Sequence, residues 1–331
     1  MIRLSAPGWS LLVVASAFAS GIAARAAKAA EVAEPGPRVV VERILGGPGA
    51  ERRTVGQWLA GLEPAAALER PYAVAWEGDE LLVADPAAGR VVRFDARGRE
   101  RGASPAGALE GPIALAVCRW GIAVSDSRAG TVVLLDRRLR PARVLAEELA
   151  RPTGIACDDR YVYVIETAAH HVLVVRPEGG VARVFGTRGD GEAEYNFPAA
   201  LALDGDALLV GDTLNFRVQR LRAADGHYLR SFGRLGDAPG ETPRIKGIAV
   251  DGGGRTWITD AYLDRIAIFD REGRLLGDIG GPGSEPGQFA FPAGIAAGPG
   301  GGVAIVDSLN RRIQVLRLSH PGAALKAGGS R

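Results

Sequence analysis

The sequence predicts an all-β fold, and three observations lead to this prediction. Glycine (46 residues) and proline (20 residues) are abundant among 331 residues, as expected for many short strands joined by turns. Glu and Lys never gather into a long amphipathic segment. A short apolar string, usually opened by proline, recurs six times at intervals of 40 to 47 residues. Repeats of this length are typical of propeller blades with four strands each. The sequence therefore predicts a six-bladed β-propeller of four-stranded antiparallel blades. The blades are expected to start near Pro71, Pro112, Pro152, Pro198, Ile245 and Pro292.

Within each repeat, the pattern of side chains predicts the order of the strands. The first strand has Ala or Gly at alternate positions, as at Gly154 and Ala156. Innermost strands crowd toward the axis, where small side chains let neighbouring sheets approach. A second apolar strand ends in an acidic residue such as Asp212, and a third begins five residues later. The fourth strand ends in Phe-Gly, as at Phe232 and Gly233.

The sixth repeat lacks a fourth strand, and the other end of the chain supplies a candidate. Residues 38–45 resemble the fourth strand of the fifth repeat, and both are followed by Gly-Gly-Pro-Gly or its equivalent. We therefore expect this N-terminal strand to complete the last blade and close the ring, which removes sheet edges and ties the termini together. The propeller then spans residues 38–318, and residues 319–331 form a flexible tail.

The first 29 residues have the pattern of a secretory signal peptide. A positive start precedes an apolar run, and small-residue cleavage sites lie near Ala26 or Ala29. Residues 30–37 are a linker. The protein is therefore expected to be exported to the periplasm or the extracellular space, with no membrane span after cleavage. The alternative is an uncleaved anchor.

The charge of the chain argues against nucleic-acid binding. The net charge is +2, and the predicted leader carries three of the cationic residues, so the mature chain is close to neutral. The two cysteines, Cys118 and Cys157, occupy similar places in consecutive repeats and could be joined. Because disulfide geometry is strict, buried free thiols are the preferred interpretation.

Two of the turns share a longer motif. Asp-x-x-Asn-x-Arg-(Val/Ile)-Gln begins at Asp212 and again at Asp307. This motif, with the Pro-x-Gly-Ile-Ala openings and Phe-Gly endings, resembles the NHL repeat, and the resemblance covers residues 38–318. It implies a six-bladed propeller. Propellers of this type serve as protein-binding, RNA-binding and sensor domains, and similar propellers hold lyases, lactonases and hydrolases that use metals in the channel.

The acidic residue after every second strand suggests a ring of six carboxylates, but a structural role explains it better. An acidic residue that recurs in every blade fits a turn cap that binds backbone amides and the arginine five residues later, whereas a metal site uses few ligands. The residues assigned to this structural role are Asp85, Asp126, Glu166, Asp212, Asn215, Arg217, Asp260, Arg265, Asp307, Asn310 and Arg312.

No catalytic residue and no resident metal are predicted. The adjacent His170 and His171 form the only histidine pair, and two neighbouring side chains that point apart are too few for a metal site. Ser127 and Ser308 lack the setting of a nucleophile.

The loops between blades and the turns between second and third strands emerge on one face, here called the loop face. Aromatic, Arg and Asn side chains there are what a recognition surface enriches. Phe216, Tyr262 and Arg311 occupy variable positions of the motif and are the preferred contacts. The full set of candidate binding residues is Phe216, Tyr262, Arg311, Arg188, Tyr195, Asn196, Arg234 and Asp264.

The sequence thus favours an exported, monomeric, non-catalytic recognition or scaffold propeller without a cofactor. It would bind a protein, peptide or glycan on the loop face. The alternative is a channel-centred lyase or hydrolase assisted by a divalent cation such as calcium.

Overall fold

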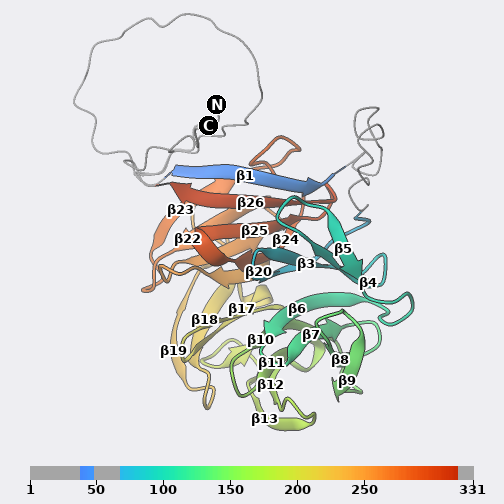
Figure 1. Cartoon of the computed structure of the whole chain (residues 1–331). Coiled ribbons are helices and arrows are strands. Elements are labelled where there is room, and N and C mark those ends of the chain that lie inside the picture. The colour runs from blue at the N-terminus through green and yellow to red at the C-terminus, as the bar shows by residue number, and fades with distance from the viewer. Residues whose placement is uncertain (1–37, 48–67, 320–331) are drawn as a thin grey trace, which may run out of the picture.

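The computed structural model describes residues 38–47 and 68–319. These residues form six four-stranded antiparallel sheets in a ring, which confirms the predicted six-bladed propeller (Figure 1). The predicted signal peptide, its cleavage sites and the linker lie outside the described residues. The last described residue, Ser319, still belongs to a strand rather than to the expected tail.

Each of the first three blades is formed by consecutive strands, with the first strand innermost. Blade one consists of β2 (Ala73–Glu77), β3 (Glu80–Asp85), β4 (Arg90–Phe94) and β5 (Glu100–Ala103). Blade two consists of β6 (Pro112–Cys118), β7 (Gly121–Asp126), β8 (Thr131–Leu135) and β9 (Pro141–Ala146). Blade three consists of β10 (Pro152–Cys157), β11 (Val162–Glu166), β12 (His171–Val175) and β13 (Val181–Phe185).

The next two blades follow the same order, and the last one uses both ends of the described chain. Blade four consists of β16 (Ala200–Asp204), β17 (Ala207–Asp212), β18 (Arg217–Arg222) and β19 (Tyr228–Phe232). Blade five consists of β20 (Ile245–Val250), β21 (Thr256–Asp260), β22 (Arg265–Phe269) and β23 (Leu275–Gly280). Blade six consists of β24 (Pro292–Ala297), β25 (Gly302–Asp307), β26 (Arg312–Ser319) and β1 (Arg38–Gly46).

Strand β1 closes the ring as predicted. It pairs antiparallel with β26, from Arg38 opposite Ser319 to Gly46 opposite Arg312, with a bulge between Val41 and Arg43. Figure 1 shows β1 lying along β26 at the edge of the last blade. The strand from the N-terminal side therefore joins the two ends of the propeller in one sheet.

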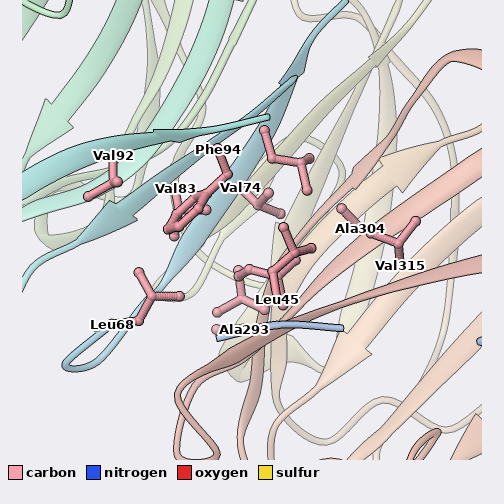
Figure 2. Close-up of a cluster of buried hydrophobic side chains, with 12 residues drawn as sticks. Leu45, Leu68, Val74, Val83, Val92, Phe94, Ala293, Ala304 and Val315 are labelled. Atoms are coloured by element: carbon pink, nitrogen blue, oxygen red, sulfur yellow. The ribbon is translucent and has the colours of Figure 1, made fainter. Parts of the chain in front are cut away.

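The hydrophobic core lies between neighbouring blades. At the ring closure, Leu45 of β1 and Val315 of β26 share one cluster with Val83 and Phe94 of the first blade (Figure 2). Small residues on the innermost strands allow this packing near the axis. A Cβ atom on Gly154 would lie 2.8 Å from the carbonyl oxygen of Ala199 in the next blade, so no larger residue fits there.

Regular structure outside the blades is limited to short pieces in the described part of the chain. A two-stranded parallel pair, β14 (Thr187–Arg188) and β15 (Glu194–Tyr195), braces the loop into blade four. The helical pieces are 3-10 turns of three residues each: η1 (Thr167–Ala169), η2 (Thr213–Asn215) and η3 (Pro299–Gly301). Among the described residues, no helix has the length and apolar character needed to cross a membrane.

The two cysteines are joined, which corrects the preferred interpretation as free thiols. Cys118 and Cys157 end the innermost strands of adjacent blades, with their Cα atoms 5.8 Å apart, and they form a disulfide. The antiparallel order inside each blade brings the same end of both strands to the same side of the ring. The similar place of the cysteines in consecutive repeats was therefore the decisive signal.

Candidate ligand site at the channel mouth

The turn after the second strand of blade four is held by one buried carboxylate. Asp212 accepts hydrogen bonds from the backbone N–H of Asn196 (2.6 Å) and from the side chains of Asn215 (2.8 Å), Arg217 (3.0 Å) and Gln219 (3.2 Å). Arg217 and Gln219 also donate to the carbonyl oxygen of Glu194. The motif thus fastens its own turn to the loop that enters the blade.

The same network recurs in blade six. Asp307 accepts from the backbone N–H of Ala290 (2.7 Å) and from Asn310, Arg312 and Gln314. Both Arg312 and Gln314 donate to the carbonyl oxygen of Gln288 in the entering loop. These contacts leave both carboxylates with several donors each and no exposed surface.

In the other four blades the acidic residue also binds the backbone of the entering loop, but the side chains that pair with this residue differ. Asp85, Asp126, Glu166 and Asp260 each accept a backbone N–H from 15 or 16 residues earlier in the chain. In blade three His171 takes the place of arginine, 2.6 Å from Glu166.

Arg265 of blade five differs from the expected pairing with the acid that ends the second strand. It lies 3.2 Å from Asp278 of β23 and donates to the loop carbonyls of Asp237, Ala238 and Glu241. Burial raises the pKa of Asp278, and the charge of Arg265 opposes that rise.

The fourth residue after each of these carboxylates has the same backbone conformation whatever its type. All six have positive φ between 49° and 67°, the left-handed region that glycine favours. These residues are Gly89, Gly130, His170, Phe216, Asp264 and Arg311. Variation in residue type at this position therefore coexists with a fixed turn geometry.

Two of these left-handed residues hold a phenylalanine that precedes the next blade. Nδ1 of His170 accepts the N–H of Phe197 at 3.2 Å, and Oδ1 of Asp264 accepts the N–H of Phe291 at 2.7 Å. Burial raises the pKa of Asp264, and the nearby charges of Asp307 and Asp260 raise it further, while the bond from Phe291 lowers it. The Asp264 carboxylate thus has a hydrogen-bond partner within the protein, the N–H of Phe291.

The structure separates the predicted binding residues into three groups: exposed residues, half-buried residues, and the fully buried Tyr195. Arg188, Arg234, Tyr262 and Arg311 are exposed, and Arg234 is paired with Glu241 at 2.8 Å. Asn196, Phe216 and Asp264 are half-buried.

Tyr195 is fully buried in the core between blades three and four, so its prediction as a surface contact is wrong. It lies three residues before Pro198, and the equally buried Phe289 lies three residues before Pro292. Gly186 allows this packing, because a Cβ atom there would lie 2.2 Å from the Tyr195 ring.

Two adjoining cavities lie on the propeller axis and at its mouth on the loop face. The channel cavity has a volume of about 360 Å³ and is lined by the first strands of all six blades. The mouth cavity has a volume of about 710 Å³ and is lined by the turns and loops of blades three to five. Both are lined by Arg151, Thr167, Ala199 and Lys246, so the channel opens into the mouth.

The mouth cavity combines exposed apolar side chains with positive charge. Leu214 is 47%, Leu235 60% and Tyr262 70% exposed. Arg151 and Arg244 directly precede the first strands of blades three and five. Of the preferred sequence candidates, the lining includes Tyr262 and not Phe216 or Arg311.

Sequence reasoning missed Leu214, Leu235, Arg151, Arg244 and Lys246. One signal was available for Lys246, the second residue of its repeat, where the other repeats have Tyr, Ile, Thr or Ala. Within residues 38–47 and 68–319, no group of three or more His, Cys, Asp or Glu is placed to hold a metal ion.

No protein-family model and no curated protein matches the chain. Solved structures do match. A streptogramin B lyase structure is 15% identical, covers 77% of this chain and 95% of its own, and has a TM-score of 0.58. A gluconolactonase from Xanthomonas campestris is 17% identical, covers 84% and 98%, and has a TM-score of 0.60. A nidogen/laminin complex structure is 15% identical, covers 66% and 81%, and has a TM-score of 0.54. These likenesses establish the propeller fold, which hosts both enzymes and a member of a protein complex.

Proposed function

We propose that this protein is an exported recognition propeller of the NHL-repeat type that binds a polypeptide ligand on its loop face. The observation that carries the proposal is the mouth cavity, where Leu214, Leu235 and Tyr262 remain largely exposed around about 710 Å³ of open volume. Ligand sites are concave, largely preformed and lined by apolar side chains with a few polar groups. This cavity has those features.

The fastened turns support the proposal, because they make the mouth rigid before a ligand arrives. Leu214 lies within the turn that Asp212 and Asn215 hold together, and Tyr262 lies in the turn held by Asp260. A rigid scaffold that presents loop side chains is the usual arrangement of a binding surface. The motif residues thus act on the ligand indirectly, through the turns that carry the contacts.

The disulfide supports export. Disulfides persist in oxidising compartments and are rare in the cytosol of most cells. The Cys118–Cys157 bond therefore agrees with the signal peptide that residues 1–29 predict.

The second candidate, a channel enzyme assisted by a divalent cation, has the fold likeness to a lyase and a gluconolactonase in its favour. The described lining of the channel cavity contains Arg151 and Lys246 and no Asp, Glu, His or Cys. Such a lining attracts anions rather than a calcium ion. A rise in melting temperature on adding calcium chloride would favour this candidate over the recognition propeller.

The test compares two triple variants on peptides from a broad-specificity digest of bacterial envelope proteins. The loop-face variant carries Leu214→Ser, Leu235→Ser and Tyr262→Ser. Its matched control removes three similarly exposed apolar side chains from the outermost strands β9, β13 and β19. The control substitutions are Val144→Ser, Val184→Ser and Leu229→Ser.

We expect the immobilised wild-type and control proteins to retain the same subset of peptides and the loop-face variant to lose it. Retention of one peptide set by all three proteins would refute the proposal. Retention of glycans and not peptides from the same extract would refute its polypeptide part.

A further inference from the structure

Three cationic side chains line the two cavities, and the fold does not need them. Arg151 and Arg244 precede β10 and β20, and Lys246 is the second residue of β20. The position of Arg151 and Arg244 is also an arginine in blade one (Arg70), but it is a glycine or phenylalanine in the other three blades. Lys246 stands where the other first strands begin with uncharged residues. The same turn and strand therefore form without these charges.

The three cations have no hydrogen bond or ion pair from their side chains to any described residue. Lys246 lies 5.8 Å from the ring of Phe291, its one charge-related contact among the described residues. Arg217 and Arg312 differ, since each binds a carboxylate and loop carbonyls. The arginines that fasten the fold thus have carboxylate and carbonyl partners, and the side chains of Arg151 and Arg244 have none among the described residues.

The balance of charge around the cavities is positive. Asp237 is the only acidic residue among the described residues that line either cavity. The lining also includes the three cations Arg151, Arg244 and Lys246, and low-dielectric cavity walls strengthen the field of the excess positive charge. The planar guanidinium groups suit a carboxylate, to which they donate two parallel hydrogen bonds.

The apolar part of the mouth lies next to this charge. Leu214, Leu235 and Tyr262 line the same cavity as Arg244 and Lys246. A group that fills the cavity must therefore offer both an apolar surface and a negative charge. A volume of about 710 Å³ suits a few amino-acid residues rather than a folded domain.

We propose that the ligand enters the mouth with a free C-terminal carboxylate and an apolar last residue. The carboxylate binds among Arg151, Arg244 and Lys246, and the apolar side chain packs on Leu214, Leu235 and Tyr262. This inference rests on the proposed recognition of a polypeptide, and it identifies the C-terminal residue as the part of the polypeptide that binds in the mouth. Capture of a C-terminal carboxylate is a recurring mode of peptide recognition.

The experiment uses two tetrapeptides that differ only in charge, acetyl-Ala-Ala-Leu-Phe as the free acid and as its amide. Calorimetric titration into the wild-type protein is expected to show at least about tenfold tighter binding of the acid, because the bond is charge-assisted. The variant Arg151→Gln, Arg244→Gln, Lys246→Gln is expected to bind both peptides equally weakly. Raising sodium chloride is expected to weaken only the acid.

The glutamine variant should fold, because the backbone of these residues makes the structural bonds. The carbonyl oxygen of Arg151 accepts from Thr167, and the N–H of Arg244 donates to Asp260. An unchanged melting temperature checks this. The outer-strand variant Val144→Ser, Val184→Ser, Leu229→Ser is the matched control and should keep the preference for the acid.

The outcomes distinguish failure of this inference alone from failure of the proposed function. Equal binding of acid and amide by the wild type, or no binding of the acid, overturns the inference, while loop-face retention of digest peptides would still support recognition. A third probe, acetyl-phenylalanine, tests whether the ligand is a small carboxylic acid with an apolar group rather than the end of a polypeptide. If it binds with the same dependence on the three cations and the tetrapeptides do not bind, the mouth takes small carboxylic acids, and the polypeptide part of both proposals fails.

Discussion

The substitution Asp212→Asn isolates the fastening role of the turn carboxylate. It keeps the size of the side chain but replaces one oxygen by an NH₂ group. All four contacts of Asp212 are donors: the N–H of Asn196 and the side chains of Asn215, Arg217 and Gln219. In either orientation the new NH₂ group meets a donor, and a fully buried site has no water to relieve this.

The expected loss follows from breaking a buried ion pair, which costs about 3–5 kcal/mol. With about 260 structured residues and an unfolding entropy of about 2.1 cal/mol/K per residue, this corresponds to a fall in Tm of about 5–9 °C. Differential scanning calorimetry at pH 7 measures it. The control is Asp225→Asn in the exposed Arg222–Asp225 pair, which should leave Tm unchanged because surface ion pairs contribute little. A Tm for Asp212→Asn within about 1 °C of wild type would refute the assigned role.

Three further changes test other parts of the fold. Leu45→Ala removes a buried contact of the closing strand and should cost about 2–5 kcal/mol in urea unfolding, whereas Ile44→Ala on the exposed side of β1 should cost little; equal losses would contradict the closure. Replacing Cys118 and Cys157 by serine opens a loop of sequence separation 39 and should lower the free energy of unfolding by about 4 kcal/mol. The unfolded wild-type protein should show thiols only after reduction, and free thiols before reduction would disprove the bond. Asp264→Asn should raise Tm at pH 7. Burial raises the pKa of Asp264, so the folded protein takes up a proton at pH values between the unfolded and the folded pKa, and the stability of the wild type falls as pH rises through this range. Asn has no charge to bury, and its side-chain oxygen can still accept the backbone N–H of Phe291. The gain should vanish near about pH 3, where the wild-type carboxyl is protonated in both states; a gain that persists there would contradict the titration.

Much of the fold could be predicted from the sequence because the repeat reports it directly. The spacing of the opening strings predicts six blades, and the missing fourth strand near Leu318 matches the extra strand at 38–45. The disulfide needed a comparison of register between blades. Cys118 and Cys157 end equivalent innermost strands of adjacent blades, which brings their Cα atoms to 5.8 Å, within the range that a disulfide needs.

The candidate site was less predictable because it depends on the direction of side chains in the turns. The variable position of Phe216 suggested a contact, yet the residue there is left-handed in every blade and half-buried in blade four. The exposed position lies two residues earlier, at Leu214 and Tyr262. Tyr195 could have been placed in the core by its equivalence to Phe289.

The positive charge at the mouth comes from blades that are separate in the sequence. Arg151 belongs to the entry into blade three, and Arg244 and Lys246 belong to blade five. Only the ring brings them to one cavity. No local pattern in the chain indicates this meeting, so the site had to come from the structure.

Hydrogen exchange with and without a bound peptide tests most directly whether the loop face is the binding site. The peptide is one that the wild-type protein retains from the envelope digest. We expect slower exchange in the backbone around Leu214, Tyr262 and the loop 235–244, and unchanged exchange in the outermost strands β9 and β13. Protection of those outer strands, with no change around the mouth, would contradict the proposed site.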